Sequence, residues 1–295
     1  MKNILLLGSD ASYLAQEIKG FNVKTVFTKK FPDGETYVRL PVDVQNSDIV
    51  YIQNFFPHQN DSIVEALLTI EGLKDYKANL KGLIAPYFPY ARQDKKFLEG
   101  EVISFKAIIK LFSSLGVKRI GSINTHALKK PGVYTIEDVE FHNEDASPLL
   151  YSYFNDEEFL AVAPDKGAEH LVSNFKKKII LKKERGKYVD SKASTQRPVE
   201  RIVGDVPEGV ERAIIFDDMI STGGTIVKAT KFLLSHGVKR VSCATIHGLF
   251  INDAVEKLKD AGIEEIVTTN SVKNEFARIS ITPIIHRLAS TFFEL

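Results

Sequence analysis

Short apolar segments alternate with amphipathic segments along almost the whole chain, and this alternation restricts the fold more than any other feature of the sequence. A strand covered on both faces is apolar throughout, whereas a helix lying on a sheet is apolar along one stripe. The alternation is typical of an α/β fold with mostly parallel strands. The chain has 295 residues, near twice the usual ~150-residue domain, so we expect two similar domains of this class.

The apolar runs also predict individual elements. We expect strands at residues 2–7, 81–85, 117–124, 159–163, 178–181 and 212–216. We expect helices at residues 62–73, 104–115, 168–176, 225–235 and 283–295. Ser62 and Glu65 have the spacing of a capping box at the start of the first helix.

The domain boundary is expected near residues 146–148, after an acidic and turn-prone stretch at 137–145. Residues 116–120 and 237–241 have similar sequences, which fits an internal duplication. A glycine that ends a helix before a strand is also common in unrelated segments. Residues 183–198 are rich in Lys, Ser, Asp and Gly and are predicted to form a mobile loop.

Composition excludes several classes of function. The chain carries 39 Lys and Arg against 38 Asp and Glu, a net charge of +1, which argues against binding nucleic acid or an anionic membrane through bulk electrostatics. The apolar runs are far shorter than the ~20 residues of a membrane span, and the amino terminus lacks the pattern of a signal peptide. Cys243 is the single cysteine, so no intrachain disulfide forms and we expect a cytoplasmic protein.

The strongest chemical signal is the segment 214–225, where an apolar strand leads into two carboxylates, a turn with hydroxyls and glycines, and a helix. Glycines let a backbone wrap around an anion, and the N–H groups at a helix N-terminus point toward it. Asp217 and Asp218 repel a phosphate but suit the hydroxyls of an attached sugar, or a cation. A capped helix after a strand is the plainer interpretation, and it leaves the carboxylates and glycines unexplained. We therefore expect a sugar-phosphate site made of Asp217, Asp218, Ser221, Thr222, Gly223, Gly224 and Thr225.

Residues 216–225 resemble the phosphoribosyl diphosphate signature shared by type I phosphoribosyltransferases and ribose-phosphate diphosphokinases. Residues 31–35, 86–95 and 162–167 resemble the diphosphokinases alone, and the order of the motifs matches along nearly the whole chain. The sequence is thereby identified as a member of the ribose-phosphate diphosphokinase family. This resemblance implies transfer of the diphosphoryl group of Mg-ATP to the C1 hydroxyl of ribose 5-phosphate, giving phosphoribosyl diphosphate and AMP for nucleotide biosynthesis.

The resemblance also implies the organisation of the chain. Both domains should be type I phosphoribosyltransferase-like, with residues 1–146 on the ATP side and residues 147–282 carrying the ribose 5-phosphate loop. The helix at 283–295 should pack back on the first domain. A homo-oligomer, a dimer or a multiple of it, is implied because the 31–35 segment contacts ATP held mainly by a neighbouring subunit.

The ATP residues implied by the resemblance lie in two segments of the first domain. An aromatic and two carboxylates in a Pro-Gly turn suit a loop that stacks on a base and accepts hydrogen bonds. An arginine after a strand suits phosphate, and a glutamine suits polar groups of a nucleotide. The expected residues are Phe31, Asp33, Glu35, Arg92, Gln93 and Asp94.

The resemblance assigns His126 and Asp165 to a Mg²⁺ site, with Asp165 also contacting the ribose. The family motif Asp-x-His reads Asn124-Thr125-His126 here, so one carboxylate ligand is missing. A lone histidine is more often structural than functional, and that interpretation applies to the other six histidines. These are His58, His142, His170, His236, His247 and His286.

Lys183 and Arg185 match the family's catalytic pair, and His126 is the third catalytic candidate. Diphosphoryl transfer concentrates negative charge on the transferred oxygens, so positioned cations contribute strongly to the rate. Lys182 is an equally close match for the lysine, a plain lysine-rich surface is the alternative, and the sequence supplies no general base.

Two other functions remain open at this point. A phosphoribosyltransferase would use the same 217–225 loop but has no need of the first 146 residues. A catalytically silent homologue would keep the fold as a binding subunit; His126, Lys183 and Arg185 argue against it, whereas Asn124 leaves room for it.

Overall fold

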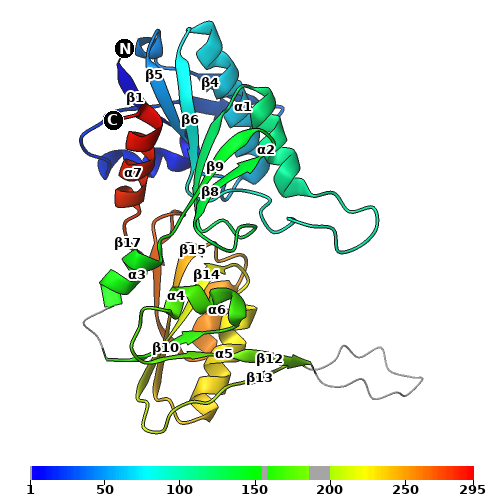
Figure 1. The fold of residues 1–295 in the computed structure, drawn as a ribbon, viewed down its shortest axis with the longest axis vertical. Coiled ribbons are helices and arrows are strands. Elements are labelled where there is room, and N and C mark those ends of the chain that lie inside the picture. Colours follow the sequence, from blue (N-terminus) through cyan, green and yellow to red (C-terminus); the bar gives the residue numbers. More distant parts are fainter. Residues whose placement is uncertain (1, 155–157, 186–199) are drawn as a thin grey trace. The chain divides into compact units, whose positions relative to one another are not determined.

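The computed structural model describes residues 2–154, 158–185 and 200–295, and it divides into two units (Figure 1). The first unit comprises residues 1–146, 271–273 and 280–295, and the second comprises residues 147–270 and 274–279. The chain therefore returns to the first unit at its carboxyl end, from Ser280 onward. No helix in the described ranges has the length and apolarity needed to span a bilayer.

The first unit is built on a seven-stranded sheet with the order β2-β1-β5-β6-β7-β9-β8, in which only the β8–β9 pair is antiparallel. Its strands are β1 (Asn3–Leu7), β2 (Asn22–Thr25), β5 (Asp48–Ile52), β6 (Asn79–Ala85), β7 (Arg119–Ile123), β8 (Gly132–Ile136) and β9 (Val139–Glu144). Its helices are α1 (Gln59–Asp75), α2 (Ser104–Ser114) and α7 (Thr282–Phe293), with 3-10 turns at Ser9–Gln16 and Val42–Val44. Ile63, Ala66, Ile70 and Leu73 give α1 its buried stripe, as the helical spacing of apolar residues predicts.

Helix α7 packs on the first unit at two glycines of its sheet. A Cβ added to Gly82 on β6 would lie 2.4 Å from Cδ2 of Phe292, and one added to Gly121 on β7 would lie 2.9 Å from the Leu288 methyl groups. Any larger residue at either position therefore displaces the helix.

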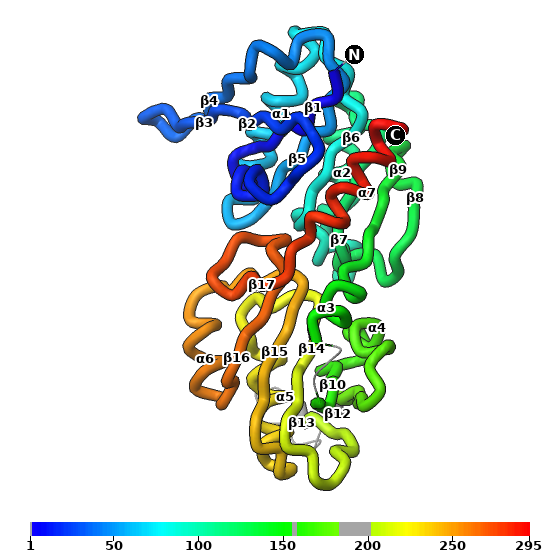
Figure 2. Tube along the Cα trace, turned by 90° about the vertical axis from the view of Figure 1, so that its left-hand side faces the viewer, coloured from blue at the N-terminus to red at the C-terminus, as the bar shows by residue number. Residues whose placement is uncertain are grey.

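A separate two-stranded hairpin, β3 (Phe27–Lys30) and β4 (Thr36–Arg39), projects from the first unit, as Figure 2 shows. Its tip is closed by backbone hydrogen bonds from Phe31 N to Glu35 O (2.8 Å) and from Gly34 N to Phe31 O (2.9 Å). Gly34 has a φ of +94°, a left-handed conformation that favours glycine.

The second unit has a six-stranded parallel sheet with the order β11-β10-β14-β15-β16-β17. Its strands are β10 (Leu160–Ala163), β11 (Lys178–Ile180), β14 (Arg212–Ile220), β15 (Arg240–Gly248), β16 (Ile263–Thr269) and β17 (Ala277–Ile279). Its helices are α3 (Ser147–Phe154), α4 (Glu169–Val172), α5 (Gly224–Ser235) and α6 (Ala254–Asp260), with a 3-10 turn at Lys166–Ala168. A second hairpin, β12 (Lys182–Arg185) and β13 (Glu200–Val203), accompanies this sheet.

The two sheets share one topology. With the parallel strands numbered in chain order, both read 2-1-3-4-5-6, and the first sheet adds the antiparallel β8 at its edge. The prediction of two similar α/β domains with mostly parallel sheets is therefore confirmed. The sequence similarity between 116–120 and 237–241 does not reflect this repeat, because Gly116 precedes the fifth parallel strand and Gly237 precedes the fourth.

Several local predictions were wrong. Helix α1 begins at Gln59, so Ser62 is inside the helix and forms no capping box with Glu65. Residues 139–144 of the expected turn-prone stretch form β9, and only Glu137 and Asp138, both with positive φ, make a turn. The helix expected at 168–176 is reduced to the four residues of α4.

Candidate active site

The predicted sugar-phosphate residues of the second unit lie around the carboxyl ends of β10 and β14. From the β10–β14 pair the sheet extends to β11 on one side and to β15 on the other, which is the topological switch point of an open α/β sheet. Ligands of such sheets bind outside the carboxyl ends of the strands at that point. Asp165 follows β10 directly, and Asp217 and Asp218 lie near the end of β14.

Strand β14 continues through both aspartates to Ile220, so the expected end at Phe216 was wrong. Parallel pairing of Asp217 with Thr245 on β15 holds this part of the strand, and Asp218 N donates to Asp217 Oδ1 (2.9 Å). Burial raises the pKa of Asp217 well above its ordinary value, and the nearby charges of Asp218 and Asp165 raise it further. The structure thus brings the three predicted aspartates together, where a ligand that donates hydroxyls or carries a cation relieves their repulsion.

The turn after β14 leads into an uncapped helix. Gly223, the N-cap of α5, has a φ of +75° and makes no side-chain capping hydrogen bond within the described residues. A Cβ added to Gly224 would meet no heavy atom within 4 Å, so open space adjoins the start of the helix. The first N–H groups of a helix have no intrahelical acceptor. The arrangement suits an anion such as a phosphate, and Ile251 N fixes the turn by donating to Ser221 O (3.0 Å).

Asp165 is oriented by its own turn. Its Oδ1 accepts a hydrogen bond from Gly167 N (2.9 Å), and a Cβ added to Gly167 would lie only 3.0 Å from that oxygen. Glycine at 167 therefore allows the carboxylate to sit close to the backbone.

In the first unit, His126 is exposed on a turn after β7. The turn is held by Asn124, whose φ of +39° is a conformation that asparagine tolerates. Asn124 Nδ2 donates to Asp145 Oδ1 (3.1 Å), and its Oδ1 accepts from Ala146 N (2.7 Å). Both ends of this amide are therefore used within the fold, and the residue serves a structural purpose.

The six expected ATP residues lie on two segments of the first unit. Phe31, Asp33 and Glu35 form the exposed tip of the β3–β4 hairpin, where Asp33 Oδ1 accepts from Glu35 N (3.2 Å). Arg92, Gln93 and Asp94 lie in an irregular loop beyond the end of β6 at Ala85.

Gln93 organises the loop around it. Its Nε2 donates to Lys95 O (3.1 Å) and to Glu101 Oε2 (3.3 Å), and the same carboxylate accepts from Phe97 N (2.6 Å). Backbone hydrogen bonds from Phe97 N and from Leu98 N (3.0 Å) lower the pKa of Glu101.

The first turn of α1 contacts both ATP segments. Lys30 Nζ, at the base of the hairpin, lies 2.5 Å from Asp61 Oδ2. The Tyr90 hydroxyl, two residues before Arg92, donates to Asn60 Oδ1. Asn60 and Asp61, successive residues of α1, therefore hold the hairpin and the 92–94 loop, the two segments predicted from the sequence to contact ATP.

Lys183 and Arg185 lie on β12, whose backbone pairs with β13 through Lys183↔Ile202 and Arg185↔Glu200. Their side chains are outside the described part of the chain. The prediction of a loop from residue 183 was wrong for 183–185, which form a strand, and residues 186–198 of that prediction lie outside the described residues.

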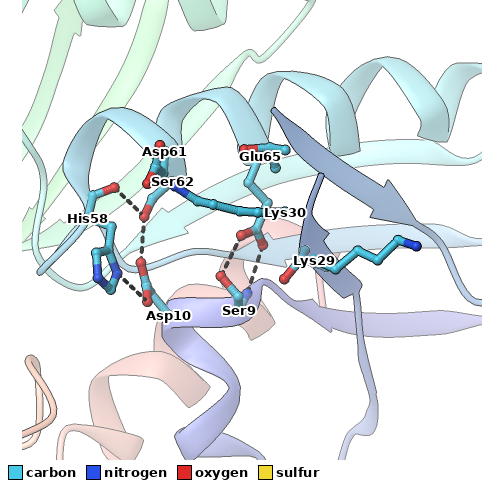
Figure 3. Close-up of a pocket in the computed structure, with 10 residues that line it drawn as sticks. Ser9, Asp10, Lys29, Lys30, His58, Asp61, Ser62 and Glu65 are labelled. Carbon is cyan, nitrogen blue, oxygen red and sulfur yellow. Dashed lines mark hydrogen bonds and ion pairs between the residues drawn. The ribbon is translucent and has the colours of Figure 1, made fainter. Parts of the chain in front are cut away.

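A pocket that was not predicted from the sequence lies at the carboxyl ends of β1 and β5, the switch point of the first sheet (Figure 3). The pocket is lined by Ser9, Asp10, Thr28, Lys29, Lys30, Thr36, His58, Asp61, Ser62 and Glu65. Ser62 and Glu65 were assigned to a capping box, and His58 was taken as structural. The available signal was the position of Ser9 and Asp10 directly after a strand.

Most of the remaining histidines have structural contacts. His142 pairs with Glu140 (2.6 Å), the His286 ring contacts Phe21, and His247 is buried in β15. His170 lies 3.1 Å from Gly167 O, and His236 contacts the Phe232 ring.

The residues suit Mg²⁺ only in part. Carboxylates such as Asp165 offer the oxygen ligands that Mg²⁺ prefers, whereas the imidazole of His126 does not. Within the described residues no group of three or more His, Cys, Asp or Glu side chains is arranged to hold a metal. In the described part of the chain the aspartates therefore do not form a metal cage by themselves.

Two family models match the chain. One describes the N-terminal domain of ribose phosphate pyrophosphokinase and matches residues 4–116, and the other describes the phosphoribosyl synthetase-associated domain and matches residues 170–286. The ribose-phosphate pyrophosphokinase of Sulfolobus acidocaldarius is 31% identical over 268 residues, covering 88% of this chain and 89% of the relative. That of Methanobrevibacter smithii is 32% identical over 290 residues, covering 93% and 94%.

Among solved structures, the crystal structure of phosphoribosylpyrophosphate synthetase from Mycobacterium smegmatis is similar over the whole chain. It aligns with a TM-score of 0.80 at 28% identity, covering 99% of each chain. The two-unit α/β architecture is thus shared with a solved structure from end to end.

Proposed function

The chain belongs to the ribose-phosphate pyrophosphokinase family, and we propose on that premise that it transfers the diphosphoryl group of ATP to the C1 hydroxyl of ribose 5-phosphate. The products are phosphoribosyl diphosphate and AMP. The observation that supports the proposal most is in the second unit, where Asp165, Asp217 and Asp218 lie close together and the turn after β14 leads into the uncapped N-terminus of α5. That combination suits a sugar that carries a phosphate.

We assign ribose 5-phosphate to these aspartates and to the turn at residues 221–225. The 5-phosphate accepts hydrogen bonds from the N–H groups of the 221–225 turn and from the hydroxyls of Ser221, Thr222 and Thr225. The ribose hydroxyls donate to Asp217 and Asp218, which explains why two like charges lie side by side in a partly buried position.

We assign ATP to the first unit, through the hairpin tip and the 92–94 loop. The exposed Phe31 ring offers a surface on which a base stacks, and Asp33 and Glu35 offer acceptors. Arg92 supplies a fixed positive charge for phosphate. A homo-oligomer is part of this proposal, because the hairpin projects from its own unit and suits a nucleotide held by a second copy.

Mg²⁺ belongs to the proposal as the partner of the ATP phosphates. When bound, it neutralises their charge and withdraws electrons from the β-phosphorus. Asp165 is the residue we assign to it, with Asp217 and Asp218 nearby, and His126 is a weaker candidate because its donor is nitrogen.

In the proposed reaction the C1 oxygen attacks the β-phosphorus, and the bond from that phosphorus to the bridging oxygen of AMP breaks. Negative charge develops on the bridging and equatorial oxygens. Lys183 and Arg185 stabilise that charge, and the Asp217–Asp218 pair orients the attacking sugar. No side chain is assigned as a general base.

The test is to incubate the reduced protein with Mg·ATP and ribose 5-phosphate and to separate the nucleotides. The protein is kept reduced because we propose that it is cytoplasmic, on the ground of its single cysteine, Cys243. AMP without ADP is expected. ADP alone would indicate an ordinary kinase, and no nucleotide product would favour a silent binding subunit.

A further inference from the structure

The β3–β4 hairpin has two unlike faces. On one face, Phe27 and Tyr37 contact edge to face at 6.3 Å, and the Lys29 ammonium lies 5.0 Å from the Tyr37 ring. On the other, Thr28, Lys30 and Thr36 line the pocket of the first unit, as the alternation of side chains along a strand requires. Lys29 also borders the pocket, but Figure 3 shows its amino group directed away from the other lining residues.

Among the residues that line the pocket, Lys30 and Asp61 form the ion pair that joins the hairpin to α1. Lys30 Nζ lies 2.5 Å from Asp61 Oδ2, and Figure 3 shows the lysine chain extended toward the first turn of the helix. Lys30 precedes Phe31, the first residue of the tip. A displacement at this pair therefore moves the whole tip, because the hydrogen bonds of the tip itself make it a closed turn.

The helix turn that carries Asp61 is fixed in place. The Ser62 hydroxyl lies 2.5 Å from Asp10 Oδ2, and His58 Nδ1 lies 3.7 Å from Asp10 Oδ1. One turn later, Glu65 accepts from both the N–H (2.8 Å) and the hydroxyl of Ser9. Glu65 is 4% exposed, and burial raises the pKa of its carboxyl group. The hydrogen bonds from Ser9 stabilise this carboxyl group in its buried position beside the loop after β1.

The starts of α1 and α5, the helices that follow the third parallel strand of each sheet, have different surroundings. Open space adjoins Gly224 at the start of α5. At the start of α1, Ser62 bonds to Asp10 and Ser9 bonds to Glu65, so this helix is tied to the loop after β1. These bonds make the start of α1 a rigid support for the hairpin.

We propose that the Lys30–Asp61 pair is the anchor of the hairpin and that it positions Phe31, Asp33 and Glu35 for ATP. Tyr90, bonded to Asn60, holds the 92–94 loop on the adjacent residue of the same helix turn. The anchor therefore fixes the hairpin relative to the first turn of α1, the turn that also holds Tyr90. This inference rests on the ATP role of the hairpin in the proposed function.

The kinetic test is to measure Lys30→Met and Asp61→Asn. We expect the KM for ATP to rise about two- to fivefold, the range of an exposed ion pair, with kcat and the KM for ribose 5-phosphate unchanged. The exchanged pair Lys30→Asp/Asp61→Lys should recover part of the loss. Lys24→Met is the matched control, because Lys24 and Asp43 form a similar exposed pair (2.7 Å) on the same unit.

A second measurement separates this inference from the proposed function. The chain has no tryptophan, so Tyr37→Trp places a single reporter on the hairpin. In that background Lys30→Met should lower the fluorescence anisotropy without substrate, and Lys24→Met should not. Unchanged anisotropy would overturn the anchor. Lower anisotropy with an unchanged KM for ATP would support the anchor and overturn the ATP role of the hairpin.

Discussion

Asn124 donates a hydrogen bond from Nδ2 to Asp145 Oδ1 across 3.1 Å, linking the end of β7 to the residue that follows β9. The family resemblance places an aspartate at 124. In this chain a carboxylate there would face the carboxylate of Asp145, so the amide fits its surroundings. The neighbouring carboxylate of Asp145 thus explains why position 124 carries an amide and no negative charge.

Asn124→Asp is therefore expected to lower the free energy of unfolding by ~1–3 kcal/mol, because one hydrogen bond is lost and two carboxylates meet. Denaturant unfolding at neutral pH measures the loss. The double variant Asn124→Asp/Asp145→Asn should restore stability, and a single variant as stable as the parent would contradict the structural role of Asn124.

Asp217→Asn should stabilise the ligand-free protein at neutral pH. Burial raises the pKa of Asp217, so its contribution to stability is fully present below the ordinary pKa and is lost as the pH rises through the raised value. We expect the variant to gain about 2–4 °C in Tm at pH 8 and less at pH 4.5. Thermal unfolding without substrates checks this, with Asp205→Asn, an exposed position of the same unit, as the control. The same variant should bind ribose 5-phosphate more weakly.

Lys183→Ala should reduce turnover by about 10³-fold or more, the scale of a positioned cation in phosphoryl transfer, while ribose 5-phosphate binding stays nearly intact. Calorimetry measures the binding and AMP release measures the turnover. Lys182→Ala resolves which of the adjacent lysines acts. If Lys182→Ala shows the loss and Lys183→Ala does not, the assignment moves by one residue.

Gly82→Ala should destabilise the first unit by about 1–3 kcal/mol, because the new methyl group meets the ring of Phe292 on α7. The measurement is denaturant unfolding followed by circular dichroism. Phe292→Leu in the Gly82→Ala background should recover part of the loss by removing the clash. A destabilisation that Phe292→Leu deepens would show that the ring is not the obstacle.

Cys243 should resist thiol reagents in the folded protein. The residue is 1% exposed on β15, so a reagent cannot reach its sulfur. Burial also raises the pKa of the thiol, so little of the reactive thiolate form is present. We expect no reaction with a thiol-specific chromophore in native buffer and full reaction in denaturant. Rapid native labelling would mean that β15 opens readily.

The sequence predicted the elements whose signals are local. The pattern at 212–225 correctly predicted a strand, a glycine-bearing turn and a helix start, because glycines, hydroxyls and helix starts act within a few residues. The apolar alternation predicted the α/β class for the same reason. The extent of β14 was missed, since its pairing with β15 overrides the unfavourable strand propensity of Asp217 and Asp218.

The tertiary structure alone decided what depends on residues far apart in the chain. Lys30 meets Asp61, Ser9 meets Glu65 and Asn124 meets Asp145 only after the sheet has set the order of its strands. A sequence pattern reflects the secondary-structure preference of each segment. These three residue pairs depend instead on which strand ends become neighbours in the sheet. The sequence thus determined the strand, glycine-bearing turn and helix of residues 212–225, and packing decided that the start of α1 is tied to the loop after β1 and holds the hairpin.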